Sequence, residues 1–354
     1  MTEPLDTHLP RPLLALTMGD PAGIGLELTL KIWQAIAAAP NDGRYDVVLY
    51  GDPDQVAACA QRAGIANPGI IVEKPEDARG VWPNRLPVSP IRLTTPAVPG
   101  TPDPANARAV ISAIEQATSA VMAGQADAIV TNPIAKHVLH QAGFTHPGHT
   151  EFLAELASCS TGGRPWHPVM MLACDELRVV PLTIHIPISD VPAAISEDLI
   201  IETVRIVAAG LKRDFGIAGA PRIAIAGLNP HAGENGSIGT EDQRIIAPAI
   251  AKLRSEGFAV SGPHSADTLF HAAARAGYDA VLAMYHDQAL IPIKTLAFDS
   301  GVNVTLGLPF VRTSPDHGTA FDIAGTGKAN PASLEAALNL AARMALNRAA
   351  APAP

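Results

Sequence analysis

The chain has 354 residues, of which 47% are hydrophobic and 17% are charged. This balance suits a compact globule of about two domains and argues against a disordered chain. The formal net charge of −9 and an aromatic content of 4% disfavour binding to nucleic acid or to anionic lipid, because both partners need a basic face.

Short apolar runs alternate with longer amphipathic segments. Residues 13–17 and 46–50 predict strands, followed by helices at 26–39 and 53–63. The clearest helix covers 104–123, where Asp103 can cap the start, Pro104 suits the first position and Gly124 ends it. Further strands are predicted at 128–130, 169–173, 178–184, 222–226, 280–284 and 302–306, and further helices at 197–215, 242–256 and 331–348.

The proline-rich stretch 67–103 interrupts this rhythm, and we expect it to be irregular with one or two edge strands. The alternation elsewhere predicts an α/β protein with a largely parallel sheet that is covered on both faces.

Three predicted strands are each followed by a histidine, namely His185, His231 and His286. Ligands of open parallel sheets bind beyond the carboxyl ends of the strands. Three neutral imidazoles that meet there would form a divalent metal site with an open position for substrate. The alternative is that each histidine is an ordinary surface or hydrogen-bonded residue.

A second set of residues suits an anionic, phosphorylated ligand. Residues 19–25 (GDPAGIG) follow a strand and open a helix, a setting for anion binding by backbone N–H groups, but they match neither the P-loop nor the dinucleotide fingerprint. A tight turn against the sheet is the alternative. Lys136, Lys294 and Arg312 are candidate cations, with Asn303 between the last two.

Two polar positions allow both a structural and a binding role. Thr150, in PGHTEF (147–152), could cap the following helix or present itself with His149 to an anion. Asp267 could likewise cap the helix that follows it or take part in the site.

The cysteines and the N-terminal sequence bear on the compartment. Cys59, Cys159 and Cys174 are far apart and lack CxxC spacing, so we expect neither a disulfide framework nor a sulfur-ligated zinc site. Residues 1–12 have no secretory-signal pattern, and no run approaches the ~20 apolar residues of a membrane span. We therefore expect a cytoplasmic protein.

Seven motifs together resemble those of the 4-hydroxythreonine-4-phosphate dehydrogenase family of pyridoxal 5′-phosphate biosynthesis. They are TMGDPAGIG (17–25), TNPIAK (131–136), PGHTEF (147–152), LNPHAGE (228–234), ADTLF (266–270), MYHDQ (284–288) and VNVTLGLPFVRTSPDHGTA (302–320). The resemblance spans about residues 13–330. It implies an isocitrate/isopropylmalate dehydrogenase-like fold of two α/β domains with a cleft between them. We expect a discontinuous first domain at 1–147 plus 300–354, and a second at 148–299 that carries the metal histidines.

The resemblance also implies the site and the reaction. The metal ligands (zinc, magnesium or cobalt) would be His185, His231 and His286, drawn from both subunits of a homodimer. The substrate-binding residues would be His149, Thr150, Asp267, Lys294, Asn303 and Arg312, with Asp267 also a candidate proton acceptor; the nucleotide-contacting residues are not assigned. The implied reaction is NAD- or NADP-linked oxidation of 4-phosphooxy-L-threonine to 2-amino-3-oxo-4-phosphooxybutanoate, which decarboxylates to 3-amino-2-oxopropyl phosphate.

Related enzymes with the same core motifs oxidise other phosphorylated hydroxy acids, so 4-phosphothreonate and 4-phosphoerythronate are alternative substrates. A phosphate acyltransferase of similar architecture and a non-catalytic sugar-phosphate sensor are the rival classes. A transferase reduces no nicotinamide cofactor, which separates it from a dehydrogenase.

Overall fold

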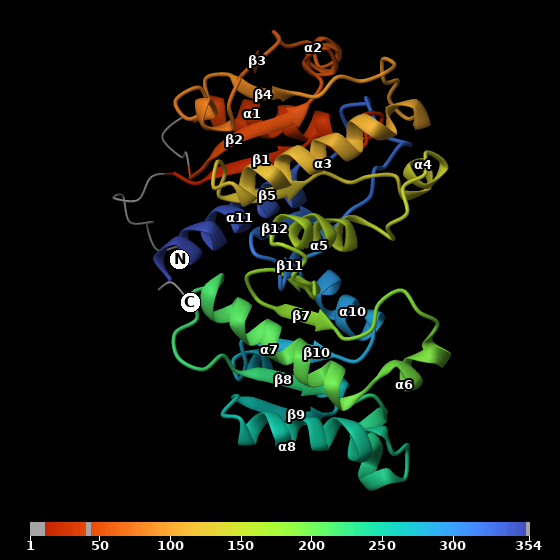
Figure 1. Cartoon of the computed structure of the whole chain (residues 1–354). Coiled ribbons are helices and arrows are strands. Elements are labelled where there is room, and N and C mark those ends of the chain that lie inside the picture. Colours follow the sequence, from red (N-terminus) through yellow and green to blue (C-terminus); the bar gives the residue numbers. More distant parts are fainter. Residues whose placement is uncertain (1–10, 40–43, 352–354) are drawn as a thin grey trace. The chain divides into compact units, whose positions relative to one another are not determined.

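The computed structural model describes residues 11–39 and 44–351 (Figure 1). The first ten residues, which lack a secretory-signal pattern, lie outside the described part. The chain divides into two compact units, one formed by residues up to Pro168 with Leu308–Ala350, the other by Val169–Gly307. These divisions lie further along the chain than the expected boundaries after residues 147 and 299. His149 and Thr150 consequently belong to the first unit.

The first unit contains a parallel sheet whose central strands are fully buried. Each neighbouring pair of strands in it is parallel. In order across the sheet the strands are β3 (Gly69–Ile71), β4 (Leu86–Pro90), β2 (Asp46–Gly51), β1 (Leu13–Thr17), β5 (Ala128–Thr131) and β12 (Val311–Pro315). Both β3 and β4 come from the proline-rich stretch.

Helices of the first unit pack on this sheet or on one another (Figure 1). They are α1 (Gly25–Ala38), α2 (Pro53–Arg62), α3 (Ala107–Met122), α4 (Lys136–Gln141), α5 (His149–Ser160) and α11 (Ala332–Ala350), with short 3-10 turns η2 (Pro75–Ala78) and η3 (Pro104–Asn106). The prediction for 104–123 is confirmed over η3 and α3. Asp103 accepts a hydrogen bond from the Ala105 N–H at 2.9 Å, and Gly124 follows the helix with φ +72°.

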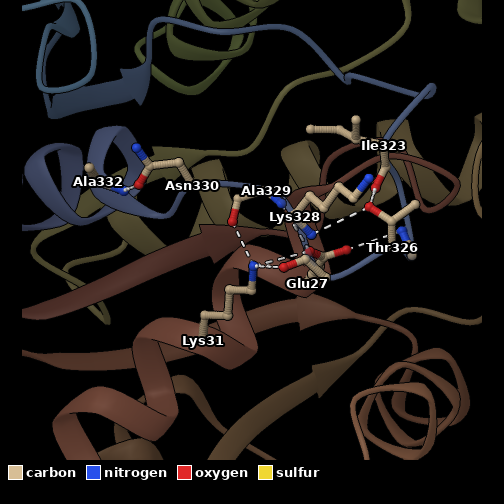
Figure 2. Close-up of polar contacts among 10 residues, drawn as sticks. Glu27, Lys31, Ile323, Thr326, Lys328, Ala329, Asn330 and Ala332 are labelled. Carbon is tan, nitrogen blue, oxygen red and sulfur yellow. Dashed lines mark hydrogen bonds and ion pairs between the residues drawn. The ribbon is translucent and has the colours of Figure 1, made fainter.

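Helix α1 also holds the loop that precedes α11 (Figure 2). Lys31 Nζ donates to the carbonyl oxygens of Gly327 and Ala329 at 2.8 and 2.6 Å and forms an ion pair with Glu27 at 3.2 Å. Glu27 in turn accepts hydrogen bonds from the N–H groups of Gly325 and Ala329. One turn of α1 therefore fixes the loop's backbone at Gly325, Gly327 and Ala329.

The second unit contains a mixed sheet. In order across it the strands are β11 (Val302–Leu306), β6 (Val169–Ala173), β7 (Arg178–Pro181), β10 (Ala280–Ala283), β8 (Ile223–Ala226) and β9 (Val260–His264). Strand β6 is antiparallel to β11 and β7, whereas β7, β10, β8 and β9 are parallel. The four-residue connection from β6 to β7 explains the exception, because so short a link can join only antiparallel strands.

The helical segments of the second unit complete its core. They are η4 (Ile188–Asp190), α6 (Val191–Ala194), α7 (Glu197–Arg213), η5 (Pro230–Gly236), the π-helix η6 (Asp242–Ile246), α8 (Ala247–Ser255), η7 (Ala266–Thr268), α9 (Ala272–Arg275) and α10 (His286–Leu296). Leu172, Val179, Val281 and Ile293 are among the buried residues that pack together around β6, β7, β10 and α10. Across the described ranges of both units, no helix is long and apolar enough to cross a membrane.

Strands β9 and β12 were not predicted from the sequence. The residues of β12 are VRTSP, which contain no apolar run, yet every one of them is buried. Packing against α11 accounts for this, since the Thr313 hydroxyl donates to the Ala337 carbonyl at 2.9 Å. The hydrogen bond to α11 therefore satisfies the buried hydroxyl of Thr313. Polar residues such as this one are the reason why the sequence pattern did not predict the strand.

Candidate active site

A group of cationic side chains lies at the start of α5 in the first unit. Arg312, on β12, is 4% exposed, and its Nη2 donates to the Thr131 hydroxyl at 2.7 Å. Burial lowers the pKa of Arg312 to about 10, against an opposing effect of Glu151. Burial, and then the charges of Arg312 and Lys136, hold the pKa of His149 well below its ordinary value. The three side chains therefore influence one another electrostatically.

The backbone and side chains around the start of α5 are arranged in a way that suits an anion. Helix α5 begins at His149 with Gly148 as its N-cap, and no side chain caps its free N–H groups. The His149 Nε2 atom is buried without a hydrogen-bond partner among the described residues. A Cβ atom at Gly148 would lie 3.4 Å from Lys136 Nζ, so glycine leaves room for that ammonium group. A phosphate monoester fits the positive charge and the unused donors.

Thr150 does not cap α5, because Gly148 occupies that position and Thr150 is the second residue of the helix. The structural alternative for Thr150 is therefore wrong. Its position at the uncapped first turn is compatible with anion binding.

Much of the backbone of the GDPAGIG segment (19–25) is hydrogen-bonded within the protein. The Asp20 side chain accepts from the Ala22 N–H at 3.0 Å, and its carbonyl accepts from the Gly23 N–H at 3.0 Å. The Ile24 N–H donates to the Thr319 carbonyl at 3.1 Å. A Cβ atom at Gly25 would approach the Met18 carbonyl to 2.8 Å. The N–H groups of Asp20, Ala22, Gly23 and Ile24 are thus used within the protein, which favours the tight-turn alternative for this segment.

Two of the predicted metal-binding histidines lie together in the second unit. His185 follows β7, and His286 begins α10 directly beyond β10, the parallel neighbour of β7. The ends of these strands are tied by the Thr183 hydroxyl, which donates to the Met284 carbonyl at 2.8 Å. The centroids of the two imidazole rings are 5.8 Å apart. His286 Nδ1 also lies 2.7 Å from a carboxylate oxygen of Asp287.

The pair fits a shared divalent ion. Metal–nitrogen bonds of about 2.1 Å place the ring centroids of two imidazoles on one ion roughly 5–6 Å apart. A carboxylate on the second nitrogen of a ligating histidine is the usual outer partner, and Asp287 occupies that position on His286. Among residues 11–39 and 44–351, no group of three or more histidine, cysteine, aspartate or glutamate side chains is arranged to hold a metal.

His231 lies on η5, the loop beyond β8, and has a left-handed backbone with φ 53°. Its charge contributes to lowering the pKa of Asp267, although the larger cause is the hydrogen bond that the Ser265 hydroxyl donates to Asp267 Oδ1. Asp267 is exposed and lies within η7, so the prediction that it caps the next helix is wrong. The structure thus brings His231 close enough to Asp267 for their charges to interact.

The remaining predicted substrate residues of the second unit are Lys294 and Asn303. Lys294 lies in the last turn of α10, with Nζ 5.5 Å from the centroid of the Phe298 ring. Asn303 lies on β11, and its Oδ1 is buried without a hydrogen-bond partner in the described structure. An orphaned buried oxygen is costly, so this atom suits a ligand donor.

Comparison with known proteins identifies the family. A family model described as pyridoxal phosphate biosynthetic protein PdxA matches residues 44–341. The chain belongs to this family. The 4-hydroxythreonine-4-phosphate dehydrogenase of Methylorubrum extorquens is 56% identical over 334 residues, which cover 94% of each chain. The Xanthobacter autotrophicus enzyme of the same name is 53% identical over 337 residues, covering 95% of this chain and 94% of the relative.

A solved structure of a PdxA relative has the same fold. The crystal structure of 4-hydroxythreonine-4-phosphate dehydrogenase from Klebsiella pneumoniae matches with a TM-score of 0.82 at 38% identity, covering 94% of this chain and 99% of that one. The predicted α/β class is confirmed, and the chain is an enzyme of a dehydrogenase family. Neither the acyltransferase nor the sensor fits these relatives.

Proposed function

We propose that the chain catalyses NAD-dependent, divalent-metal-dependent oxidation of 4-phosphooxy-L-threonine to 2-amino-3-oxo-4-phosphooxybutanoate, which decarboxylates to 3-amino-2-oxopropyl phosphate. The observation that carries the proposal is the pair of imidazoles of His185 and His286, 5.8 Å apart beyond two neighbouring parallel strands. The family and the names of its members support the substrate and the place in pyridoxal 5′-phosphate biosynthesis.

Four polar residues of the first unit are assigned to the substrate phosphate. Arg312 and His149 supply buried donors, and Thr150 and Lys136 lie at the same helix start. Lys294 and Asn303 of the second unit are assigned to the same substrate through the family resemblance. Binding the phosphate away from the reacting carbon orients that carbon, which converts binding energy into rate.

His185, His231 and His286 are assigned to a divalent ion, for which zinc, cobalt and magnesium are candidates. When bound, the ion supplies Lewis acidity toward the C3 hydroxyl of the substrate, and the nicotinamide cofactor accepts the hydride. The Asp287 carboxylate lies 2.7 Å from His286 Nδ1, which would leave Nε2 as the ligand atom. Asp267 is assigned to substrate binding and stays the candidate proton acceptor; the hydrogen bond from the Ser265 hydroxyl lowers its pKa, which makes it a weaker base than an ordinary aspartate.

We also propose that the enzyme acts as a cytoplasmic homodimer whose subunits share each metal site. In the second unit, apolar side chains that are unusually exposed follow His185 and lie on or just after α10, at Ile186, Ile188, Ile291 and Phe298. Apolar residues exposed near functional residues are typical of a protein interface. A second copy of this chain is the partner that the proposal requires.

The test is NAD reduction by the purified protein, with 4-phosphooxy-L-threonine compared with 4-phosphothreonate and 4-phosphoerythronate. The metal is first removed by a chelator and then restored as zinc, cobalt or magnesium. We expect turnover with the amino-acid substrate only in the metal-restored protein, and no turnover or bound metal in His231→Ala. Full activity in that variant would refute the metal assignment, and preference for a substrate without the amine would replace the proposed substrate.

A further inference from the structure

We propose that Asp242 is a positioning residue for His231, because its buried carboxylate fixes the backbone from which the left-handed turn of His231 begins. This inference rests on the proposed role of His231 as a metal ligand. Asp242 lies at the start of η6, eleven positions after His231, and is 1% exposed.

The turn that carries His231 has an unusual backbone. Five consecutive residues, 231–235, have φ between 40° and 78°, and four of them are not glycine. In this region the Cβ of an L-residue crowds the following carbonyl, so such residues ordinarily occur singly. A run of five persists only where the surrounding structure holds it, and such runs are concentrated at functional sites.

The carboxylate of Asp242 supplies much of that support. Its Oδ1 accepts from the Leu228 N–H at 2.9 Å, and its Oδ2 accepts from the N–H and the side-chain Nδ2 of Asn229 at 3.2 and 2.9 Å. Glu241 accepts a second hydrogen bond from Asn229 Nδ2 at 2.8 Å. The backbone is therefore fixed two residues before His231, which determines where the turn begins and where its imidazole can lie.

Close packing around the carboxylate leaves it little freedom. A Cβ atom at Gly227 would lie 2.6 Å from Asp242 Oδ1, and one at Gly239 would lie 2.5 Å from Asn229 Nδ2. Both positions must be glycine for the loop to approach so closely. The carboxylate thus packs against Gly227, and the Asn229 side chain that binds it packs against Gly239.

A second side chain joins the same loop to the helix of His286. Gln288, two residues after His286, donates from Nε2 to the Gly227 carbonyl at 2.9 Å and accepts from the Met284 N–H at 2.6 Å. The segments that carry His231 and His286 therefore share a fixed backbone point. Asp242 fixes the next two residues, Leu228 and Asn229, which lead into the left-handed turn.

The test uses Asp242→Asn, which keeps the side-chain volume but replaces one acceptor oxygen with a donor. The matched control is Asp52→Asn in the first unit. Asp52 is also buried, at 5% exposure, and accepts from the N–H groups of Asp54, Gln55 and Leu93. The probe is Co²⁺, titrated into the full-length protein and followed by its visible absorption, together with hydrogen exchange of amides 228–235.

We expect Asp242→Asn to weaken Co²⁺ binding about 10- to 100-fold, the usual effect of removing an outer-shell partner, and to accelerate exchange at 228–235. Asp52→Asn should lower the thermal midpoint without changing Co²⁺ affinity by more than about twofold. Unchanged affinity in Asp242→Asn, or equal losses in both variants, would overturn the proposal.

A milder variant covers the case in which Asp242→Asn does not fold. Asn229→Ala removes the side-chain donor but keeps both backbone hydrogen bonds to Asp242, and we expect a several-fold loss of Co²⁺ affinity. Wild-type affinity in Asn229→Ala would then overturn the proposal. Failure of the proposed function gives a different result, since the wild-type protein would then bind no Co²⁺ although amides 228–235 would still lose protection in Asp242→Asn.

Discussion

The buried guanidinium of Arg312 predicts that Arg312→Met stabilises the unliganded protein and abolishes its stabilisation by a phosphorylated ligand. Burial lowers the pKa of Arg312 from 12.5 to about 10, which corresponds to about 3 kcal/mol against the folded state. Arginine is protonated in both states at pH 7, so the full cost applies there and declines only as the pH rises above about 10. Loss of the hydrogen bond to Thr131 offsets about 1 kcal/mol of the gain.

Other favourable interactions of Arg312, such as that with Glu151, offset more of the gain, so the net gain is at most about 2 kcal/mol, which corresponds to a thermal midpoint at most roughly 4–8 °C higher for a unit of about 200 residues. Scanning calorimetry at pH 7, with and without 4-phosphooxy-L-threonine, measures both effects. The control is Arg92→Met in the same unit, where the arginine side chain is 57% exposed and pairs with Asp54 at the surface, so we expect a change below about 0.5 kcal/mol. A midpoint for unliganded Arg312→Met below that of the wild type would refute the reasoning.

Two further predictions concern the first unit. His149 stays neutral in the folded protein, whereas the unfolded chain takes up a proton as the pH drops through about 6.5, so the free energy of unfolding of the unliganded protein should fall there. We expect His149→Gln to reduce this fall. Identical profiles of unfolding free energy for the variant and the wild type between about pH 8 and 5.5 would contradict the prediction. Lys31→Met removes the hydrogen bonds from Nζ to the Gly327 and Ala329 carbonyls, so the loop before α11 should become more mobile. We expect tryptic cleavage after Lys328 to be several-fold faster than in Lys212→Met, which changes an exposed lysine elsewhere. Equal cleavage rates in the two variants would show that Lys31 does not hold the loop.

Periodicity and turn residues determined much of the fold. The alternation of apolar runs and amphipathic segments placed most of the strands and helices, because each element carries its own repeat of buried positions. Asp103, Pro104 and Gly124 fixed the ends of η3 and α3 through local hydrogen bonding and backbone geometry. The strand-end rule also indicated His185 and His286, since the ends of neighbouring parallel strands meet at one edge.

Contacts between distant residues decided the rest. Whether residues 19–25 bind an anion depends on Pro133 and Thr319, whose carbonyl oxygens accept N–H groups of that turn, and no local pattern reveals such partners. The polar strand β12 is buried because it pairs with β5 and is covered by α11, and the turn of His231 is held by Asp242 from another segment. A sequence records which groups can donate, accept or carry charge, but the choice of partner and the cost of burial arise only when the folded chain brings those groups together.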